Sequence, residues 1–232
     1  MPINQRALVD VQFEERIAWV TLNNGPVNAL GSDLLDQLTG VFDDLASSDV
    51  ADVVVVSSAL NIFSAGADVK AMKRLSNAER IEYFRRVGRL LSRLESVPFW
   101  TVSLVEGKAI GAGADLSLAC DFVFASSEAM WSFPGYLNGI RLGVKRLVAR
   151  VGPSRAFGLM ALGRKMGRDE AVTWGAVYEY TNREQLFAVI SRLSSCHGSP
   201  SASRAEMFGS GSAVEATKIL ENSLTENVVS RF

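Results

Sequence analysis

The sequence predicts an α/β fold in which strand-strand-helix units follow one another in a spiral and a helical part closes the chain. Short apolar runs rich in β-branched residues alternate with stretches of helical periodicity over the first part of the chain. Beyond about residue 145 the pattern becomes helical throughout. This order favours repeated ββα turns over a single doubly wound sheet.

The composition is typical of an ordinary globular chain. The 232 residues are 48% hydrophobic and carry a formal net charge of −1, so the chain can bury a substantial core and has no electrostatic preference for nucleic acid or membrane. No apolar run reaches the roughly 18 residues that a membrane span needs, and the N-terminal stretch lacks the features of a secretory signal. We therefore expect a cytoplasmic protein without nucleic acid or membrane partners.

Cysteine and histidine are scarce. Cys120 and Cys196 are too few for a disulfide framework, and no Cys/His cluster predicts a metal site. His197 is the only histidine and lies in a Ser/Gly/Pro-rich segment that is typical of a loop. A Ser-His-Asp hydrolase would depend on His197, and we therefore disfavour that class.

The chain opens with a predicted hairpin. Residues 8–13 and 17–22 form its strands, with a polar turn between them. Residues 34–46 then repeat apolar side chains at helical spacing. Either Ser32 or Asp33 is the expected N-cap of this helix.

A buried strand is predicted at residues 52–58, and a bend of small residues follows at 63–68. Many Lys and Arg residues then occupy 70–93. The simplest interpretation of that run is a solvated helix face. The alternative is that some of these cations neutralise the phosphates of a ligand.

A second strand-to-bend transition lies in the middle of the chain. Residues 101–105 form an apolar run, and Gly107, Gly111 and Gly113 follow it before another buried strand at 122–125. The later part of the chain predicts helices at residues 144–151, 153–162, 168–174 and 183–193. Residues 199–232 are poorer in apolar side chains and predict a short helical end.

The two bends together indicate a catalytic arrangement. Small residues allow a backbone turn whose amide N–H, at the start of a helix, points at a bound oxygen. Two such amides that converge on one atom make an oxyanion hole, in which fixed donors stand where negative charge develops.

The pair of motifs resembles the crotonase superfamily, the enoyl-CoA hydratase/isomerase fold. Residues 63–70 match its F-x-A/S-G-A-D-x-x signature, and residues 107–121 match G-x-x-x-G-G-G-x-E/D-L-x-x-x-C-D with Ala112 in place of the middle glycine. The resemblance extends from about residue 9 to about residue 201. It implies a crotonase-like spiral with its first trimerisation helices over residues 1–195 and a short C-terminal helical segment over 196–232.

The resemblance also implies an acyl-CoA-processing enzyme of fatty acid metabolism, active as a homotrimer or a dimer of trimers. The amides of Ala67 and Ala112 would hold the thioester oxygen, and Asp115 would be the acid/base, where hydratases carry their first Glu. The structural alternative for Asp115 is a helix N-terminal carboxylate that favours the helix dipole. Coenzyme A enters as part of the substrate, so neither a separate cofactor nor a metal is expected.

The remaining substrate contacts come from the same matching segments. The resemblance assigns them to Ala65, Gly66, Asp68, Val69, Lys70, Gly111, Gly135 and Tyr136. Lys70 is the expected contact for the phosphates of coenzyme A.

The sequence departs from the family at the second catalytic Glu. That Glu follows a Pro in F-x-x-P-E, whereas here Gly135 follows Pro134, and about three residues are missing from the next loop. Tyr136, Asn138 and Arg141 are the polar residues nearby that could substitute.

The reaction therefore stays open at this point. One carboxylate suits double-bond isomerisation, decarboxylation or C–C hydrolysis, and hydration or dehydration of an enoyl-CoA is also compatible. A second reading is a catalytically altered protein that binds acyl-CoA without turnover. A third reading takes residues 111–113 as a dinucleotide turn, but Leu116 occupies the place of the third glycine that G-x-G-x-x-G requires.

Overall fold

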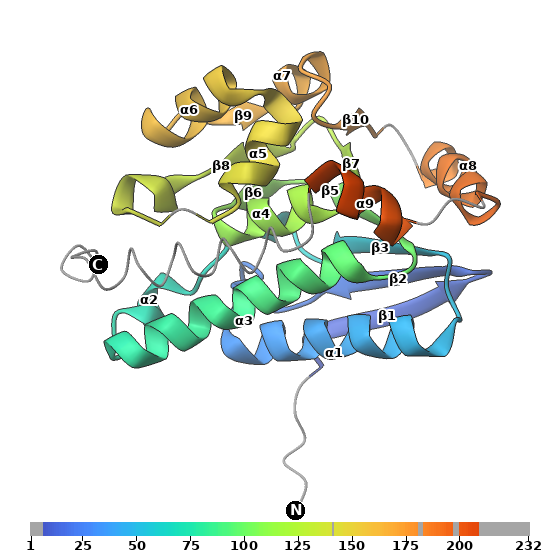
Figure 1. Ribbon diagram of the computed structural model, residues 1–232, viewed down its shortest axis with the longest axis horizontal. Coiled ribbons are helices and arrows are strands. Elements are labelled where there is room, and N and C mark those ends of the chain that lie inside the picture. The colour runs from blue at the N-terminus through green and yellow to red at the C-terminus, as the bar shows by residue number, and fades with distance from the viewer. Residues whose placement is uncertain (1–6, 141, 181–182, 197–199, 209–232) are drawn as a thin grey trace, which may run out of the picture.

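Two sheets form the centre of the fold in the computed structural model, which describes residues 7–140, 142–180, 183–196 and 200–208 (Figure 1). The larger sheet contains, in spatial order, β1 (Val9–Glu14), β2 (Ile17–Leu22), β3 (Val53–Ser58), β5 (Trp100–Val105), β7 (Phe122–Ala125) and β10 (Tyr178–Glu179). β1 and β2 are antiparallel, as the predicted hairpin requires, and the other neighbours run parallel.

The smaller sheet contains, in spatial order, β4 (Ile62–Ser64), β6 (Lys108–Ile110), β8 (Met130–Ser132) and β9 (Met166–Gly167). Consecutive strands fall into different sheets: β3, β5 and β7 belong to the larger one, and β4, β6 and β8 to the smaller one. Each pair therefore makes one turn of a spiral. The predicted ββα spiral is confirmed.

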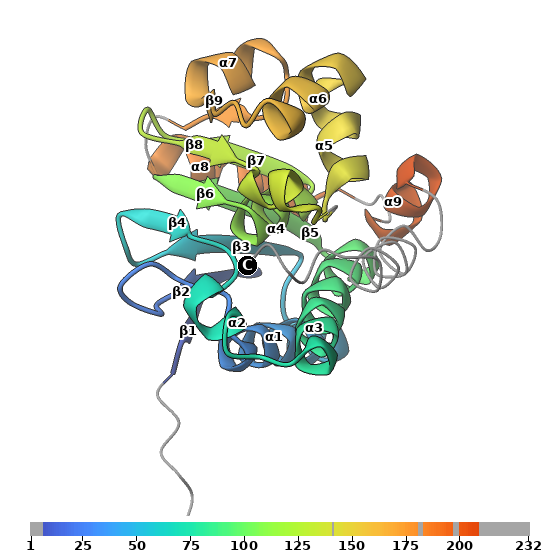
Figure 2. The ribbon, with the colours of Figure 1, turned by 90° about the vertical axis from the view of Figure 1, so that its left-hand side faces the viewer.

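The helices cover both sides of this spiral. They are α1 (Ser32–Ser48), α2 (Val69–Met72), α3 (Asn77–Ser96), α4 (Ala112–Ala119), the 3₁₀ turn η1 (Pro134–Asn138), α5 (Val144–Val151), α6 (Pro153–Ala161), α7 (Arg168–Thr173), α8 (Arg183–Ser194) and α9 (Pro200–Phe208). Figure 2 shows α1 and α3 together on one side and α5 to α7 on the opposite side. In the described part of the chain, no helix is long and apolar enough to cross a membrane.

One predicted helix start is wrong. The N-cap of α1 is Gly31, in an extended conformation and without a side-chain cap, rather than Ser32 or Asp33. The bridge between Ala29 and Gly66, together with the bond from the Leu30 amide to the Gly66 carbonyl, fixes where the chain enters the helix. A tertiary contact therefore determines this boundary instead of a local capping preference.

The β3 strand shows why its sequence is apolar without alternation. Val54 and Val56 face the main core, and Val53 and Val55 face a second cluster that includes Leu186 of α8. Successive side chains of a strand point to opposite faces, so a strand covered on both faces is apolar throughout.

The Arg residues of 80–93 mostly belong to the solvated face of α3. Arg86 pairs with Asp36 and Arg93 with Asp43, both on α1, whereas Arg89 pairs with Glu82 on α3 itself. These ion pairs support the interpretation of the Lys and Arg residues in 70–93 as a solvated helix face.

Candidate active site

The first bend follows β4 and is held by the segment before α1. The Leu30 amide donates to the Gly66 carbonyl at 2.8 Å, and the Ala65 amide donates to the Val27 carbonyl at 2.9 Å. Gly66 has a φ of 76°, which an L side chain rarely adopts. These two bonds therefore hold the backbone immediately before Ala67, one through the Ala65 amide and the other through the Gly66 carbonyl.

Asn28 organises this attachment from inside the core. It is fully buried with a φ of 47°, a conformation that Asn tolerates better than most residues. Its side-chain amide donates to the Ser58 hydroxyl at 2.8 Å and to the Phe63 carbonyl at 3.1 Å. The backbone carbonyl of Asn28 accepts a hydrogen bond from the Ser64 hydroxyl at 2.7 Å.

The second bend lies between β6 and α4. Gly111 has a φ of 53° and is the N-cap of α4, and its amide donates to the Ser132 carbonyl at 2.9 Å. All eight residues of α4 are buried, because the helix packs between the two sheets and against α3 and α5. Small residues in its first turn allow this close approach.

The two bends touch each other. A Cβ added at Gly66 would lie 2.3 Å from the Ile110 carbonyl oxygen and 3.0 Å from the Ala112 nitrogen. A Cβ at Gly113 would lie 2.6 Å from the Ser64 carbonyl oxygen. Only glycine fits at either contact, so the backbone that carries Ala67 packs directly against the backbone that carries Ala112.

Both alanines line one cavity of about 300 Å³. Among the hydrogen bonds of the described residues, none uses the amide of Ala67 or Ala112. For Ala112 this is expected, because the first amides of a helix have no partner within the helix. Their joint role as oxyanion donors is compatible with this placement and stays a prediction.

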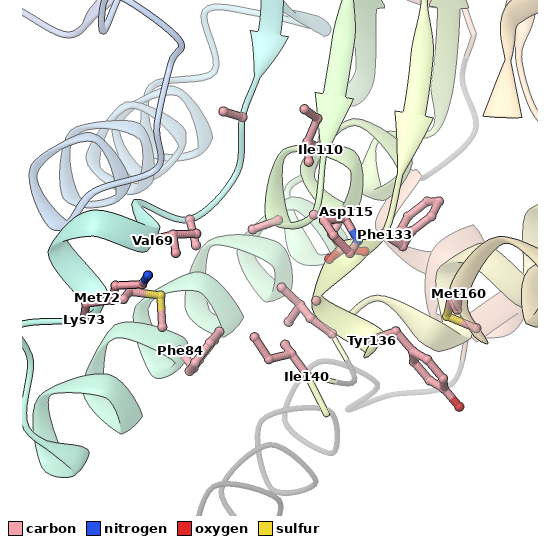
Figure 3. Close-up of a pocket in the computed structure, with 17 residues that line it drawn as sticks. Val69, Met72, Lys73, Phe84, Ile110, Asp115, Phe133, Tyr136, Ile140 and Met160 are labelled. Atoms are coloured by element: carbon pink, nitrogen blue, oxygen red, sulfur yellow. The ribbon is translucent and has the colours of Figure 1, made fainter. Parts of the chain in front are cut away.

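The cavity has an apolar wall and few polar groups (Figure 3). The apolar wall consists of Val69, Met72, Phe84, Ile110, Phe133, Pro134, Ile140, Leu142 and Met160. The titratable side chains of the described lining are Lys73, Asp115 and Tyr136. Asp115 is the single carboxylate among them.

Asp115 lies in the first turn of α4 and is 4% exposed. Burial raises the pKa of its carboxyl to about 7, and the Arg146 guanidinium opposes this shift. Arg146 itself is buried on α5 and forms an ion pair with Glu95 of α3. None of the hydrogen bonds of the described residues reaches the Asp115 carboxyl, so its own helix does not use it as a cap.

Most of the predicted site residues meet at this cavity. Those that line it are Ala65, Ala67, Val69, Gly111, Ala112, Asp115, Gly135 and Tyr136. Gly66 is not one of the lining residues, and its positive φ forms the turn of the first bend. Asp68 caps α2 instead, accepting a bond from the Ala71 amide at 2.9 Å.

The structure does not place Lys70 at the cavity. Lys70 is exposed, and Lys73, three residues further on, lines the cavity in its place. The short α2 ends at Met72, and the following residues curve back toward α3. Sequence spacing alone could not show that curvature.

The position of the missing second Glu is bordered by an apolar side chain. A Cβ at Gly135 would lie 3.4 Å from the Ile140 Cβ, within ordinary contact distance. Figure 3 shows the Tyr136 ring along the cavity with its hydroxyl directed away from Asp115. The Asn138 side chain and Arg141 lie outside the described residues, as does His197.

The spiral and the two glycine bends at one cavity define a protein of the crotonase superfamily. The sequence profile of the enoyl-CoA hydratase/isomerase family matches residues 12–216. A probable enoyl-CoA hydratase of Mycobacterium bovis is 28% identical over 226 residues, which cover 94% of this chain and 84% of that protein. The crotonyl-CoA hydratase of Syntrophomonas wolfei is 31% identical over 191 residues, which cover 79% and 72% respectively.

A solved structure shows the same fold. The crystal structure of a putative enoyl-CoA hydratase/isomerase from Bordetella parapertussis superimposes with a TM-score of 0.85 at 25% identity, covering 97% of this chain and 95% of that one. The chain belongs to the enoyl-CoA hydratase/isomerase family. It is an enzyme of that type, with Asp115 where the resemblance places the first Glu of hydratases and Gly135 where it places the second.

Proposed function

We propose that the enzyme moves a carbon–carbon double bond within an enoyl-CoA, with Asp115 as the single acid/base. The observation that carries this proposal is that Asp115 is the one carboxylate in the described cavity lining, while Gly135 offers no side chain and has the apolar Ile140 as its neighbour. A single carboxyl that can take and return one proton is sufficient for isomerisation.

The thioester carbonyl binds at the two bends. Its oxygen accepts hydrogen bonds from the amides of Ala67 and Ala112, and these bonds strengthen as the oxygen gains negative charge. Their position in a mostly apolar cavity strengthens them further, because the surroundings screen charge weakly.

The proton moves through Asp115. In a 3-enoyl-CoA the carboxylate removes a proton from C2, and the C–H electrons form the C1–C2 double bond of a dienolate while the carbonyl electrons move onto the thioester oxygen and the C3–C4 double bond stays in place. The dienolate collapses as Asp115 returns the proton to C4, which gives the 2-enoyl-CoA and the original carboxylate. A pKa of about 7 leaves both forms of Asp115 populated at neutral pH, which suits both steps.

Hydration demands more of the site. Water must be held and activated in addition to the enolate being stabilised, and the family uses two Glu residues for this. In the described lining Asp115 has no acidic partner, and Ile140 makes the opposite wall apolar. We therefore expect hydration to be much slower than isomerisation.

The apolar wall supports an apolar acyl group as the substrate class. Lys73 is exposed at the rim, where a cation suits the phosphates of coenzyme A. We also propose cytoplasmic action on fatty acyl thioesters as a homotrimer or dimer of trimers. The exposed apolar side chains Phe157 (54%) and Leu162 (80%), at α6 and its end, support assembly through the helical module.

The test uses purified protein with 3-enoyl-CoA and with crotonyl-CoA, followed by thioester absorbance and product chromatography. The 3-enoyl-CoA is expected to yield 2-enoyl-CoA, with little water added to crotonyl-CoA. Asp115→Asn should lower the isomerisation rate by about 10²-fold or more. Faster hydration than isomerisation would contradict the proposal, and tight binding without turnover would favour an acyl-CoA-binding protein.

A further inference from the structure

The segment between η1 and α5 brings a bare backbone against the Asp115 carboxyl. A Cβ added at Gly143 would lie 1.6 Å from Oδ1 of Asp115, 2.4 Å from Cγ and 3.2 Å from Oδ2. Gly143 is buried, has a φ of 66° and is the N-cap of α5. Because non-bonded carbon and oxygen atoms do not approach within 3 Å, the position accepts glycine only while the carboxyl stays where it is.

We propose that Gly143 is the positioning residue for Asp115: its backbone forms the wall against which the carboxyl rests, and this wall turns the carboxyl toward the cavity. The inference rests on the proposed function, since it explains how the single acid/base of that reaction is held.

Packing is the main restraint on the Asp115 side chain, because its polar contacts are few. No hydrogen bond of the described residues reaches its carboxyl. Arg146 acts on it from α5 but is paired with Glu95, and the other titratable groups of the described lining are Lys73 and Tyr136. With polar attachments lacking, the carboxyl takes its direction from the surfaces that it touches.

One short segment therefore borders both positions where hydratases carry their Glu residues. Ile140 lies against Gly135, where the second Glu would stand, and three residues later Gly143 lies against Asp115. The loop that lies against Gly135 also supports the Asp115 carboxyl. The shortened loop and Asp115 therefore pack against each other.

The first test compares Gly143→Ala with Gly152→Ala in the full-length enzyme. Gly152 also has a positive φ, 77°, and precedes a helix, but a Cβ there would meet no atom within 4 Å. Gly143→Ala should lower kcat for 3-enoyl-CoA about 100-fold, the effect of a roughly 1 Å displacement of a catalytic group, with KM nearly unchanged. Gly152→Ala should keep kcat near that of the wild type. Equal kcat in the two variants would overturn the proposal.

The second test does not depend on activity. Gly143→Ala is introduced into wild type and into Asp115→Ala, and the urea midpoint of each protein is measured. The new methyl group should lower the midpoint strongly when Asp115 is present and much less when the carboxyl has been removed. Equal losses in both backgrounds would show that the methyl group does not meet the carboxyl, and would overturn the proposal. If the wild type proves inactive as an isomerase, this comparison still decides whether the contact exists.

Discussion

The Asp115 carboxylate is costly to bury, and it lies at the cavity where the proposed reaction needs a base. Burial disfavours the carboxylate form, and among the described residues no hydrogen bond compensates, so the pKa rises to about 7 against the opposing charge of Arg146. The same burial weakens the solvation that would otherwise reduce the basicity of the carboxylate. One side chain thereby becomes both a competent base and a competent acid near neutral pH.

The raised pKa predicts a pH-dependent stability with a definite sign. Between pH 3.8, the ordinary pKa of an Asp carboxyl, and the folded-state pKa of about 7, the folded state keeps a proton that the unfolded state has released. The contribution of Asp115 to the free energy of unfolding is therefore complete at low pH and is lost as pH rises, by about 1.4 kcal/mol per pH unit over this interval. Urea unfolding of wild type and Asp115→Asn from pH 4 to 8 measures it.

Asp115→Asn has no proton to lose at this position. The variant should therefore gain stability relative to wild type as pH rises to about 7, and the difference should be constant above that pH. A difference that does not change with pH would contradict the raised pKa.

At the scale of elements, the site depends on two bends that touch through glycines. A methyl group at Gly66 would meet the Ile110 carbonyl oxygen at 2.3 Å, on a backbone with a φ of 76°. The two bends would have to separate, and the amides of Ala67 and Ala112 would move apart. The geometry of the proposed oxyanion hole is therefore set by backbone packing.

Gly66→Ala should accordingly lose most activity and destabilise the protein, and activity assays with urea unfolding measure both effects. Gly40→Ala is the matched control, because Gly40 lies within α1 and a Cβ there meets no atom within 4 Å. Alanine favours a helix by up to about 1 kcal/mol over glycine, so the control should be slightly more stable and equally active. Similar behaviour of the two variants would contradict the contact between the bends.

The sequence predicted both bends because their signals are local. Small residues at fixed spacing after a buried strand identify the backbone turns, and helical periodicity identified α5 and α8 closely. The Gly31 cap, Lys73 in place of Lys70, Ile140 beside Gly135 and Gly143 beside Asp115 were not predicted. The Gly31 cap and the Gly143 contact depend on segments that meet only after folding, whereas Lys73 and Ile140 depend on the exact shape of a local turn. Spacing along the chain specifies neither.

At the scale of the whole molecule, a buried arginine attaches α9 to the spiral. Arg204 is 4% exposed, and its guanidinium donates to both Asp121 carboxylate oxygens at 2.6 Å. It also donates to the carbonyls of Val97 and Phe99 at 2.7 Å. Asp121 accepts a further bond from the Thr101 amide at 2.8 Å, so one cluster joins α9, β5 and the end of α4.

Arg204→Met should therefore destabilise the protein by about 3–5 kcal/mol, because it leaves the mostly buried Asp121 carboxylate without the guanidinium that bonds both its oxygens. The free energy of unfolding in urea measures the effect. Arg16→Met is the control: Arg16 pairs with Asp52 at 2.7 Å on the exposed surface, and its loss should leave the urea midpoint nearly unchanged. Equal effects of both substitutions would contradict a structural role for the cluster.

The strands at residues 8–13, 17–22, 52–58, 101–105 and 122–125 and the later helices were predicted from the sequence, whereas this attachment was not. Arg204 and Asp121 are 83 positions apart, and nothing along the chain distinguishes Arg204 from an exposed arginine. The division into a core of residues 1–195 and an end segment of 196–232 stays a prediction. The bonds from α9 to residues 97, 99 and 121 show that these two parts are in contact.

The most direct test of the account is a crystal structure of Asp115→Asn with a 3-enoyl-CoA bound. The account predicts that the thioester oxygen lies about 3 Å from the nitrogens of both Ala67 and Ala112, with C2 and C4 of the acyl chain facing the side chain at position 115. A thioester oxygen that contacts only one of these amides, or neither, would contradict it.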